Sequence, residues 1–246
     1  MVNGKHIRLI LLGLAAALVV AYLIIGVALP LSRPDTRACE ELHIVLTDSA
    51  RRYYVSEAEL VSLLRAKGLY PVGQTMCSID LDSIERTITS HPMIRHAECY
   101  KQSCPVVMLR ASQRIPQLRV INETETYFID SDRKRMPARP SVDARVMCVV
   151  GHVSERAARN ELFDLVQWIM HDSYWRKHIS RIEVNNPKDI RLCQADGPRI
   201  LLGTPQRYEQ KMNRLHTWYQ SGADTLTATP YTELDLRYHH QVVARH

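Results

Sequence analysis

Glycine-rich phosphate-binding loops are missing from this sequence. Its 246 residues include only nine glycines, and they form neither a G-x-G-x-x-G pattern nor a Walker A pattern. Such loops supply the backbone N–H groups that cradle the phosphates of dinucleotides and nucleoside triphosphates. Nucleotide-dependent enzymes built on these loops are therefore excluded.

Other catalytic and metal-binding patterns are also lacking. There is no G-x-S-x-G nucleophile motif, and no grouping of Ser, His and Asp stands out. The densest potential metal ligands are His91, His96, Cys99 and Cys104. If residues 95–100 form a strand, His96 and Cys99 point to opposite faces of it and cannot share a tetrahedral site. We therefore predict a protein that is not an enzyme and that holds no metal ion and no cofactor.

Concentrated positive charge is absent too. The formal net charge is +6, with 24% charged residues, and no run of five or more Lys or Arg residues occurs. Nucleic-acid-binding domains usually show a stronger basic patch or stripe. The composition is that of an ordinary globular protein with a mild basic excess, and it predicts no nucleic-acid partner.

A long uncharged segment lies near the N-terminus, because no charged residue occurs between Arg8 and Arg33. At about 1.5 Å of rise per residue, a helix over 7–29 is long enough to cross the roughly 30 Å hydrocarbon core of a bilayer. A cleaved signal peptide is the alternative, but its apolar region is usually shorter and ends in an A-x-A-like site. We therefore predict a single transmembrane helix. Lys5 and Arg8 precede it, which favours a cytoplasmic N-terminus and an exported remainder.

Six cysteines, an even number, suit an oxidising compartment outside the cytoplasm. Cys99 and Cys104 flank a predicted turn at 100–103, so a disulfide that braces one hairpin is geometrically reasonable. Buried free thiols are an equally good interpretation, because cysteine is readily buried as a small apolar residue.

The first predicted module begins with a strand at 42–46 and a helix that follows it. Ser56 and Glu59 have the spacing of a capping box at the start of this helix, and Gly68 stands where a C-terminal cap is expected. Asp82 marks the start of a second helix.

Pro92 ends the second helix, and residues 95–100 and 106–112 are predicted to form a hairpin. The order strand, helix, helix, strand, strand predicts a compact α+β module.

The second module contains short predicted strands at 127–130 and 145–150 and a helix that Ser154 caps. Three further strands, at 179–184, 190–193 and 200–202, are predicted to form a meander.

Thr204 and Pro205 are the expected start of the last helix, and Gly222 is its expected end. The segment 234–238 alternates apolar and charged residues and predicts a final amphipathic strand. The fold class is α+β, with the larger domain built on an antiparallel sheet.

Three local motifs accompany this layout: Ser90-His91-Pro92-Met93-Ile94-Arg95 before the hairpin, Tyr127-Phe128-Ile129-Asp130 in the second module, and Tyr231 with Asp235-Leu236-Arg237-Tyr238 near the end. In this order and spacing, the chain resembles the FtsQ/DivIB family of bacterial cell-division proteins. The resemblance implies a cytoplasmic tail at 1–6, a transmembrane helix at 7–29, a linker at 30–41, a POTRA domain at 42–118 and a C-terminal β domain at 119–246.

The resemblance also implies a function. It implies a non-enzymatic scaffold of the division complex, or divisome, which lies in the inner membrane at the septum, exposes its bulk to the periplasm and supports septal cell-wall synthesis. The partners would be FtsB and FtsL, which are small single-pass coiled-coil proteins, together with other divisome proteins. FtsB would add a strand to the distal sheet. The implied binding residues are Tyr231, Leu236, Arg237, Tyr238, His239, His240, Gln241, Val242 and Val243.

Tyr238 is the residue of this set with two balanced interpretations. It can anchor a partner, or it can be a core tyrosine that shares a strand face with Leu234 and Leu236.

A POTRA-containing component of protein transport or outer-membrane assembly is the rival class. It ranks second because such proteins normally carry repeated modules or a barrel, whereas this chain has one module and a long apolar segment near its N-terminus.

Overall fold

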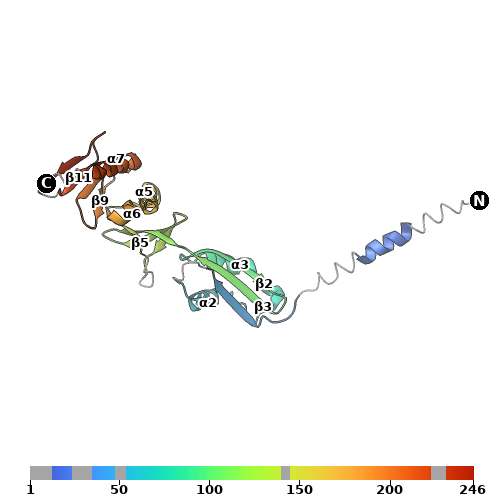
Figure 1. Ribbon diagram of the computed structural model, residues 1–246. Helices are drawn as coiled ribbons and strands as arrows, with labels where there is room; N and C mark the ends of the chain where they lie inside the picture. The colour runs from blue at the N-terminus through green and yellow to red at the C-terminus, as the bar shows by residue number, and fades with distance from the viewer. Residues whose placement is uncertain (1–12, 24–34, 48–53, 140–144, 223–230) are drawn as a thin grey trace, which may run out of the picture.

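The computed structural model describes residues 13–23, 35–47, 54–139, 145–222 and 231–246. Two folded parts lie end to end in it, and each has its own sheet and its own hydrophobic core (Figure 1).

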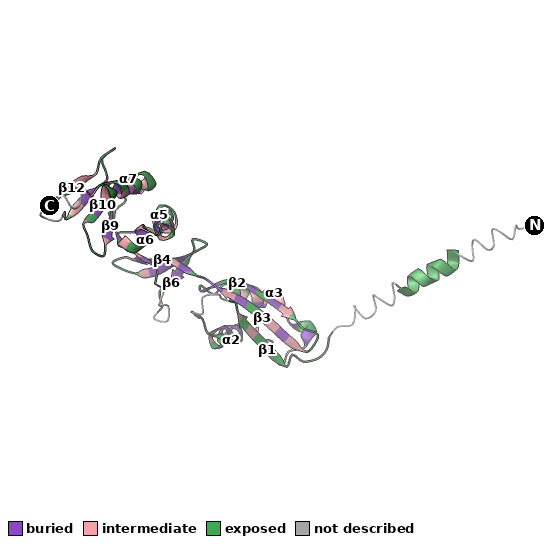
Figure 2. Ribbon diagram, viewed as in Figure 1, coloured by how far each residue is buried: buried purple, intermediate pink, exposed green. Residues whose placement is uncertain are grey.

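Residues 13–23 form a helix that is exposed along its whole length (Figure 2). Within the described residues, no helix has both the length and the apolarity that a membrane span requires. The predicted transmembrane segment 7–29 lies partly outside the described residues.

The first part is the predicted α+β module. Its elements are β1 (Glu41–Leu46), α2 (Glu57–Ala66), the 3-10 turn η1 (Met76–Ser78), α3 (Leu81–Thr89), β2 (Ile94–Lys101) and β3 (Val106–Gln113). Within the described residues, β3 lies at the centre of a three-stranded sheet, parallel to β1 and antiparallel to β2. The predicted order of strands and helices is confirmed.

The helix starts of this module differ in detail from the sequence prediction. The Ser56 hydroxyl caps α2 by accepting the Glu59 N–H at 3.2 Å. The side chain of Glu59 instead binds the Arg139 guanidinium at 2.6 Å. Helix α3 is capped by Asp80, which accepts the Ser83 N–H at 3.0 Å, so the assignment of the helix start to Asp82 was wrong. Asp80, two residues before Asp82, supplies the carboxylate that accepts a free N–H group of the first turn of α3.

The second part is built on a larger sheet. Its strands are β4 (Pro116–Ile121), β5 (Thr126–Asp130), β6 (Arg135–Pro137), β7 (Met147–Gly151), β8 (Ile179–Asn186), β9 (Asp189–Gln194), β10 (Arg199–Gly203), β11 (Glu233–Asp235) and β12 (Val243–Arg245). Among the described residues they form one nine-stranded sheet in the order β12-β11-β10-β9-β8-β7-β4-β5-β6. The module boundary at 118/119 stays a prediction; β4, which spans it, already pairs with β5 and β7 of this sheet.

The sheet is mixed rather than antiparallel, which corrects the predicted fold class in one respect. The pairs β4–β7, β7–β8 and β10–β11 are parallel. Between β4 and β7 the chain passes through β5 and β6 of the same sheet, and between β7 and β8 it passes through α4 to α6. The meander of β8, β9 and β10 is antiparallel, as predicted.

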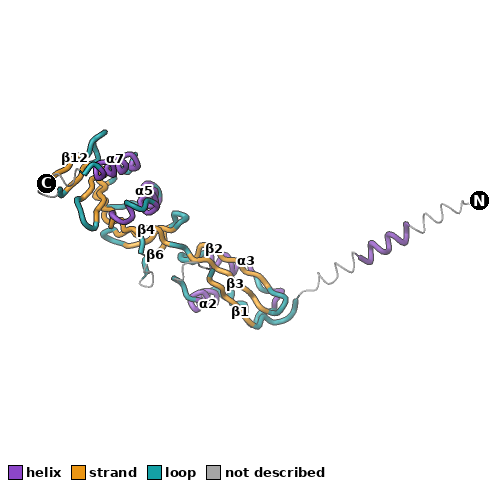
Figure 3. The backbone as a smooth tube through the Cα atoms, viewed as in Figure 1, coloured by secondary structure: helices purple, strands orange, loops and turns teal. Residues whose placement is uncertain are grey.

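The helices of this part pack beside the sheet and close its core (Figure 3). They are α4 (Glu155–Arg159), α5 (Glu161–His171), α6 (Trp175–His178) and α7 (Tyr208–Gln220). Ser154 caps α4 as predicted, but the expected single helix is interrupted at Asn160, whose φ and ψ of −114° and −98° are not helical. Helix α7 begins after Arg207, which has a left-handed φ of 55°, so Thr204 is not its cap.

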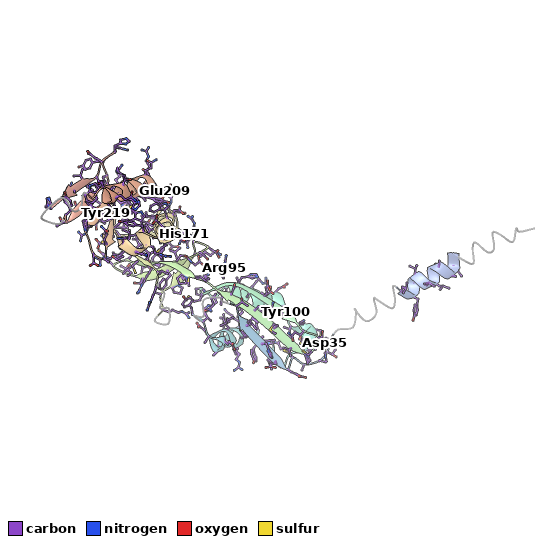
Figure 4. All side chains as sticks on the ribbon, viewed as in Figure 1. Asp35, Arg95, Tyr100, His171, Glu209 and Tyr219 are labelled. Atoms are coloured by element: carbon purple, nitrogen blue, oxygen red, sulfur yellow. The ribbon has the colours of Figure 1, made fainter. Side chains whose placement is uncertain are left out.

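Side chains from both parts meet at a joint. Phe128 of β5 and Met136 of β6 belong to the hydrophobic core of the first module, although their strands lie in the second sheet. Arg95 of β2 forms two hydrogen bonds, of 2.7 and 2.8 Å, with Asp132, and Figure 4 shows it between the two sheets. Shared core packing and ion pairs therefore connect the two modules.

Candidate partner-binding site

The segment after α7 holds a buried carboxylate that organises the predicted site. Asp235 of β11 is fully buried, and its carboxylate accepts the Arg237 backbone N–H at 3.0 Å and the Arg237 guanidinium at 2.9 and 2.6 Å. A bond from an aspartate side chain to the N–H two residues on is typical of a turn. Burial favours the neutral carboxyl, but these hydrogen bonds and the charges of Arg237 and Arg245 outweigh it and lower the pKa of Asp235.

This turn changes the expected end of the chain. The predicted strand 234–238 is limited to β11 at Glu233–Asp235, because the Asp235 side chain accepts the Arg237 N–H and forms a turn there. His240 has a left-handed φ of 62°, and the chain then returns as β12, antiparallel to β11. Within the described residues β12 pairs with β11 alone and forms one edge of the sheet.

The predicted site residues are divided between the core and the surface. Leu236 is fully buried and donates its N–H to the Leu201 carbonyl at 2.9 Å. Tyr238 is 46% exposed, so it is not the core tyrosine of the second interpretation. The other predicted residues are exposed (Arg237, His239, His240, Gln241) or half-buried (Tyr231, Val242, Val243).

Tyr231 lies at some distance from the turn in an aromatic group. Its ring stacks on His246, with centroids 4.7 Å apart, and it contacts Trp218 of α7 at 5.8 Å. The structure therefore places Tyr231 on the helix side of β12, and it places Tyr238 in the turn before β12.

A polar hollow of about 320 Å³ lies between this turn and α7. Tyr238 and His239 line one wall, and Arg207, Lys211 and Arg214 line the other. The Lys211 ammonium donates to the carbonyls of Leu202 and Thr204, both at 2.8 Å. Burial, followed by the nearby Arg214 charge, lowers the pKa of Lys211.

Arg214 lines the hollow and also contacts the turn. Its guanidinium donates to the Leu236 carbonyl at 3.0 Å, while its buried Nε has no hydrogen-bond partner among the described residues. The hollow thus gathers cationic groups, and a carboxylate is the kind of group that fits them.

This basic wall was not predicted from the sequence. A signal was present, because Arg207, Lys211 and Arg214 are spaced four and three residues apart and therefore share one face of a helix. Gly203 was also missed. An added Cβ there would lie 2.7 Å from Cγ of Arg237, so glycine is what allows the Arg237 side chain to cross this position.

The cysteines are free thiols in the structure. Cys99 is buried in the first module and Cys104 is exposed, and the structure holds no disulfide between them; of the two, only Cys99 is the buried free thiol of the alternative interpretation. Cys99 is held inside the core by its place on β2, while Cys104 lies outside the strand. Among the described residues, no group of three His, Cys, Asp or Glu side chains is placed to hold a metal ion.

Comparison with known families identifies both parts. A family model described as POTRA-like domain matches residues 37–111, and a model described as FtsQ/DivIB, C-terminal related, matches residues 115–245. No curated protein matches the chain. A POTRA-like module followed by a sheet-rich domain is thus the class of protein that the fold and the matches define.

Because the second match covers more than half of the sequence, the chain belongs to the FtsQ/DivIB family. This membership gives it a role in cell division, within a complex with other divisome proteins, and the family is generally non-enzymatic.

Proposed function

We propose that this protein is a non-enzymatic, membrane-anchored scaffold of the bacterial division complex. It binds FtsB-like and FtsL-like coiled-coil proteins and supports septal cell-wall synthesis. The observation that carries the proposal is the position of β12, which is an edge of the nine-stranded sheet within the described residues and lies beside an exposed tyrosine and a basic hollow.

The edge of β12 supplies the main-chain part of the binding. An edge strand offers N–H and C=O groups to a strand from another chain, and the side-chain surroundings select which strand is accepted. Val242 and Ala244 pack against the helix-side core, while Val243 lies opposite Asp235 in the register. Successive side chains of a partner strand would therefore alternate, with apolar ones on the helix side of the sheet and polar ones on the other side.

The hollow supplies the selective part. Arg207, Lys211 and Arg214 have no carboxylate within ion-pair distance among the described residues. A partner segment that carries Asp or Glu next to its strand would place that carboxylate against these cations, with Tyr238 covering the contact. Charge-assisted hydrogen bonds of this kind are roughly twice as strong as neutral ones.

The anchor is part of the same proposal. Within 7–29, the described helix exposes large apolar side chains, among them Leu14, Leu18 and Tyr22 at 61%, 64% and 77%. Apolar side chains of this size gain roughly 1.5 to 3 kcal/mol each when they leave water. We place this segment in the inner membrane, with the N-terminus in the cytoplasm and the two modules in the periplasm at the septum.

Affinity purification of the full chain from membranes tests the proposal. Wild type should recover FtsB-like and FtsL-like partners, and truncation after Thr229 should lose them. Since truncation also removes the buried Leu234 and Leu236, two point variants are needed. Val243→Pro alters the β12 edge, and Tyr238→Ala should weaken partner binding by about 1 to 3 kcal/mol if this side chain is a hot spot.

Tyr100→Ala, in the first module, is the matched control and should leave recovery unchanged. Unchanged partner affinity of Tyr238→Ala with an intact circular dichroism spectrum would refute the assignment of Tyr238. Recovery of outer-membrane assembly factors in place of coiled-coil partners would favour the transport function.

A further inference from the structure

A second hollow, of about 400 Å³, opens in the sheet domain beside the one described above. Its walls come from four places in the chain: the segment between β7 and α4, helix α4 with the start of α5, the β8–β9 hairpin, and the loop that follows β10. Thr204 and Gln206 of this loop line both hollows, which are therefore neighbours across a single loop.

The floor of the second hollow is apolar. Leu162 of α5, Val184 of β8 and Ile190 of β9 line it, and each is at most 4% exposed because it also belongs to the core. Ala157, Pro187 and Pro205 add further apolar surface at the sides. Ligand pockets usually measure about 300 to 1,000 Å³, so this hollow is large enough to take one or two side chains.

The rim carries two uncompensated positive charges. Arg156 on α4 and Lys188 in the β8–β9 turn are exposed, and neither has a carboxylate within ion-pair distance among the described residues. Glu161 is the single carboxylate in the lining. The cations come from different walls, so a ligand that lies across the apolar floor passes between them.

We propose that this hollow is a second docking site, which takes an acidic peptide segment anchored by one apolar side chain. The apolar floor receives the anchor, and Arg156 and Lys188 bind carboxylates on either side of it. The site does not include the β12 edge, so it offers the scaffold a second contact with a polypeptide.

The chemistry of the walls supports this occupant. An apolar floor alone would accept many ligands, but an apolar side chain flanked by carboxylates satisfies both the floor and the rim at once. Opposite charges across an interface also speed encounter and suppress partners of the wrong sign. A basic segment would meet repulsion at the rim.

Isothermal titration calorimetry on the full chain in detergent micelles tests this proposal directly. The probe is the peptide acetyl-Glu-Asp-Leu-Phe-Asp-Glu-amide. One control peptide replaces Leu-Phe by Gly-Ser, and a second replaces the four acidic residues by lysine. Wild-type protein should bind the probe and neither control, with an affinity that falls as salt rises.

Two sets of variants locate the binding. Arg156→Glu combined with Lys188→Glu should reduce affinity by more than about tenfold, because like charges then face each other across the contact, and should gain binding of the lysine peptide. Ala157→Trp should abolish binding by filling the hollow. The matched control combines Arg176→Glu with Lys177→Glu, which makes the same charge change on exposed α6 positions outside the hollow, and should retain wild-type affinity.

Absence of probe binding to wild type would overturn the proposal. An equal loss of probe affinity in the rim variant (Arg156→Glu with Lys188→Glu) and in the α6 control (Arg176→Glu with Lys177→Glu) would also overturn it. Val243→Pro keeps this test separate from the proposed function. That variant should lose the coiled-coil partners and keep the probe peptide, while the rim variant should show the reverse.

Discussion

Asp130 at the end of β5 forms a buried ion pair whose removal should strongly destabilise the sheet domain. Its carboxylate lies 2.6 Å from the Arg114 guanidinium, and the two side chains are 1% and 9% exposed. Its other oxygen accepts the N–H groups of Asp132 and Lys134, at 2.9 and 2.6 Å. One carboxylate thus satisfies a buried cation and two backbone donors.

Asp130→Leu would leave all three groups without this acceptor. Breaking a buried pair from one side costs about 3 to 5 kcal/mol, because an uncompensated charge stays buried. Arg114→Met should cost a comparable amount. The double variant should lose less than the sum of the singles, by about 2 kcal/mol or more, because no unpaired charge remains.

Urea unfolding of the full chain, followed by tryptophan fluorescence, measures these losses. All three tryptophans, Trp168, Trp175 and Trp218, lie in the second module, so the signal reports the domain that holds Asp130. Asp132→Ala is the control, because its ion pair with Arg95 is exposed and should contribute at most about 1 kcal/mol. A loss below about 1 kcal/mol for Asp130→Leu, or strict additivity in the double variant, would refute the reasoning.

Three further outcomes are expected. Gly203→Ala should lower both stability and partner affinity, because the new methyl group displaces the Arg237 side chain. The control is Gly73→Ala, which shares the positive φ but meets no neighbour within 4 Å. In urea unfolding, this control should lose only about 1 kcal/mol of stability. The lowered pKa of Asp235 means that its charged form stabilises the fold above about pH 4, so stability should fall as the pH drops below that value in wild type and much less in Asp235→Asn. Burial raises the pKa of Cys99 to about 12, so mass spectrometry after iodoacetamide treatment at pH 8 should find this thiol unmodified while exposed thiols react; rapid labelling of Cys99 in the folded chain would contradict its burial.

The first module could be predicted from the sequence because its signals are local. The Ser56 cap, the glycine at 68 and the hairpin strands each depend on residues a few positions apart. The antiparallel meander was predicted for the same reason, since its strands are joined by short turns.

The rest depends on contacts between distant residues. The parallel pairing of β4 with β7 joins residues about thirty positions apart, and no local pattern encodes it. The end of β11 was wrongly predicted because alternation continues to Tyr238, whereas the buried Asp235 binds the backbone of Arg237 and bends the chain there. The hollow of the site requires both α7 and the turn, whose lining residues lie more than twenty positions apart in the sequence.

The joint between the two modules has a mechanical consequence. Phe128 and Met136 are built into the core of the first module, and ion pairs brace the same junction. The two modules therefore form a stiff arm rather than a tether, with β12 at the end farther from β1 (Figure 2). A strand that docks on β12 is then held at a fixed reach and angle from the first module.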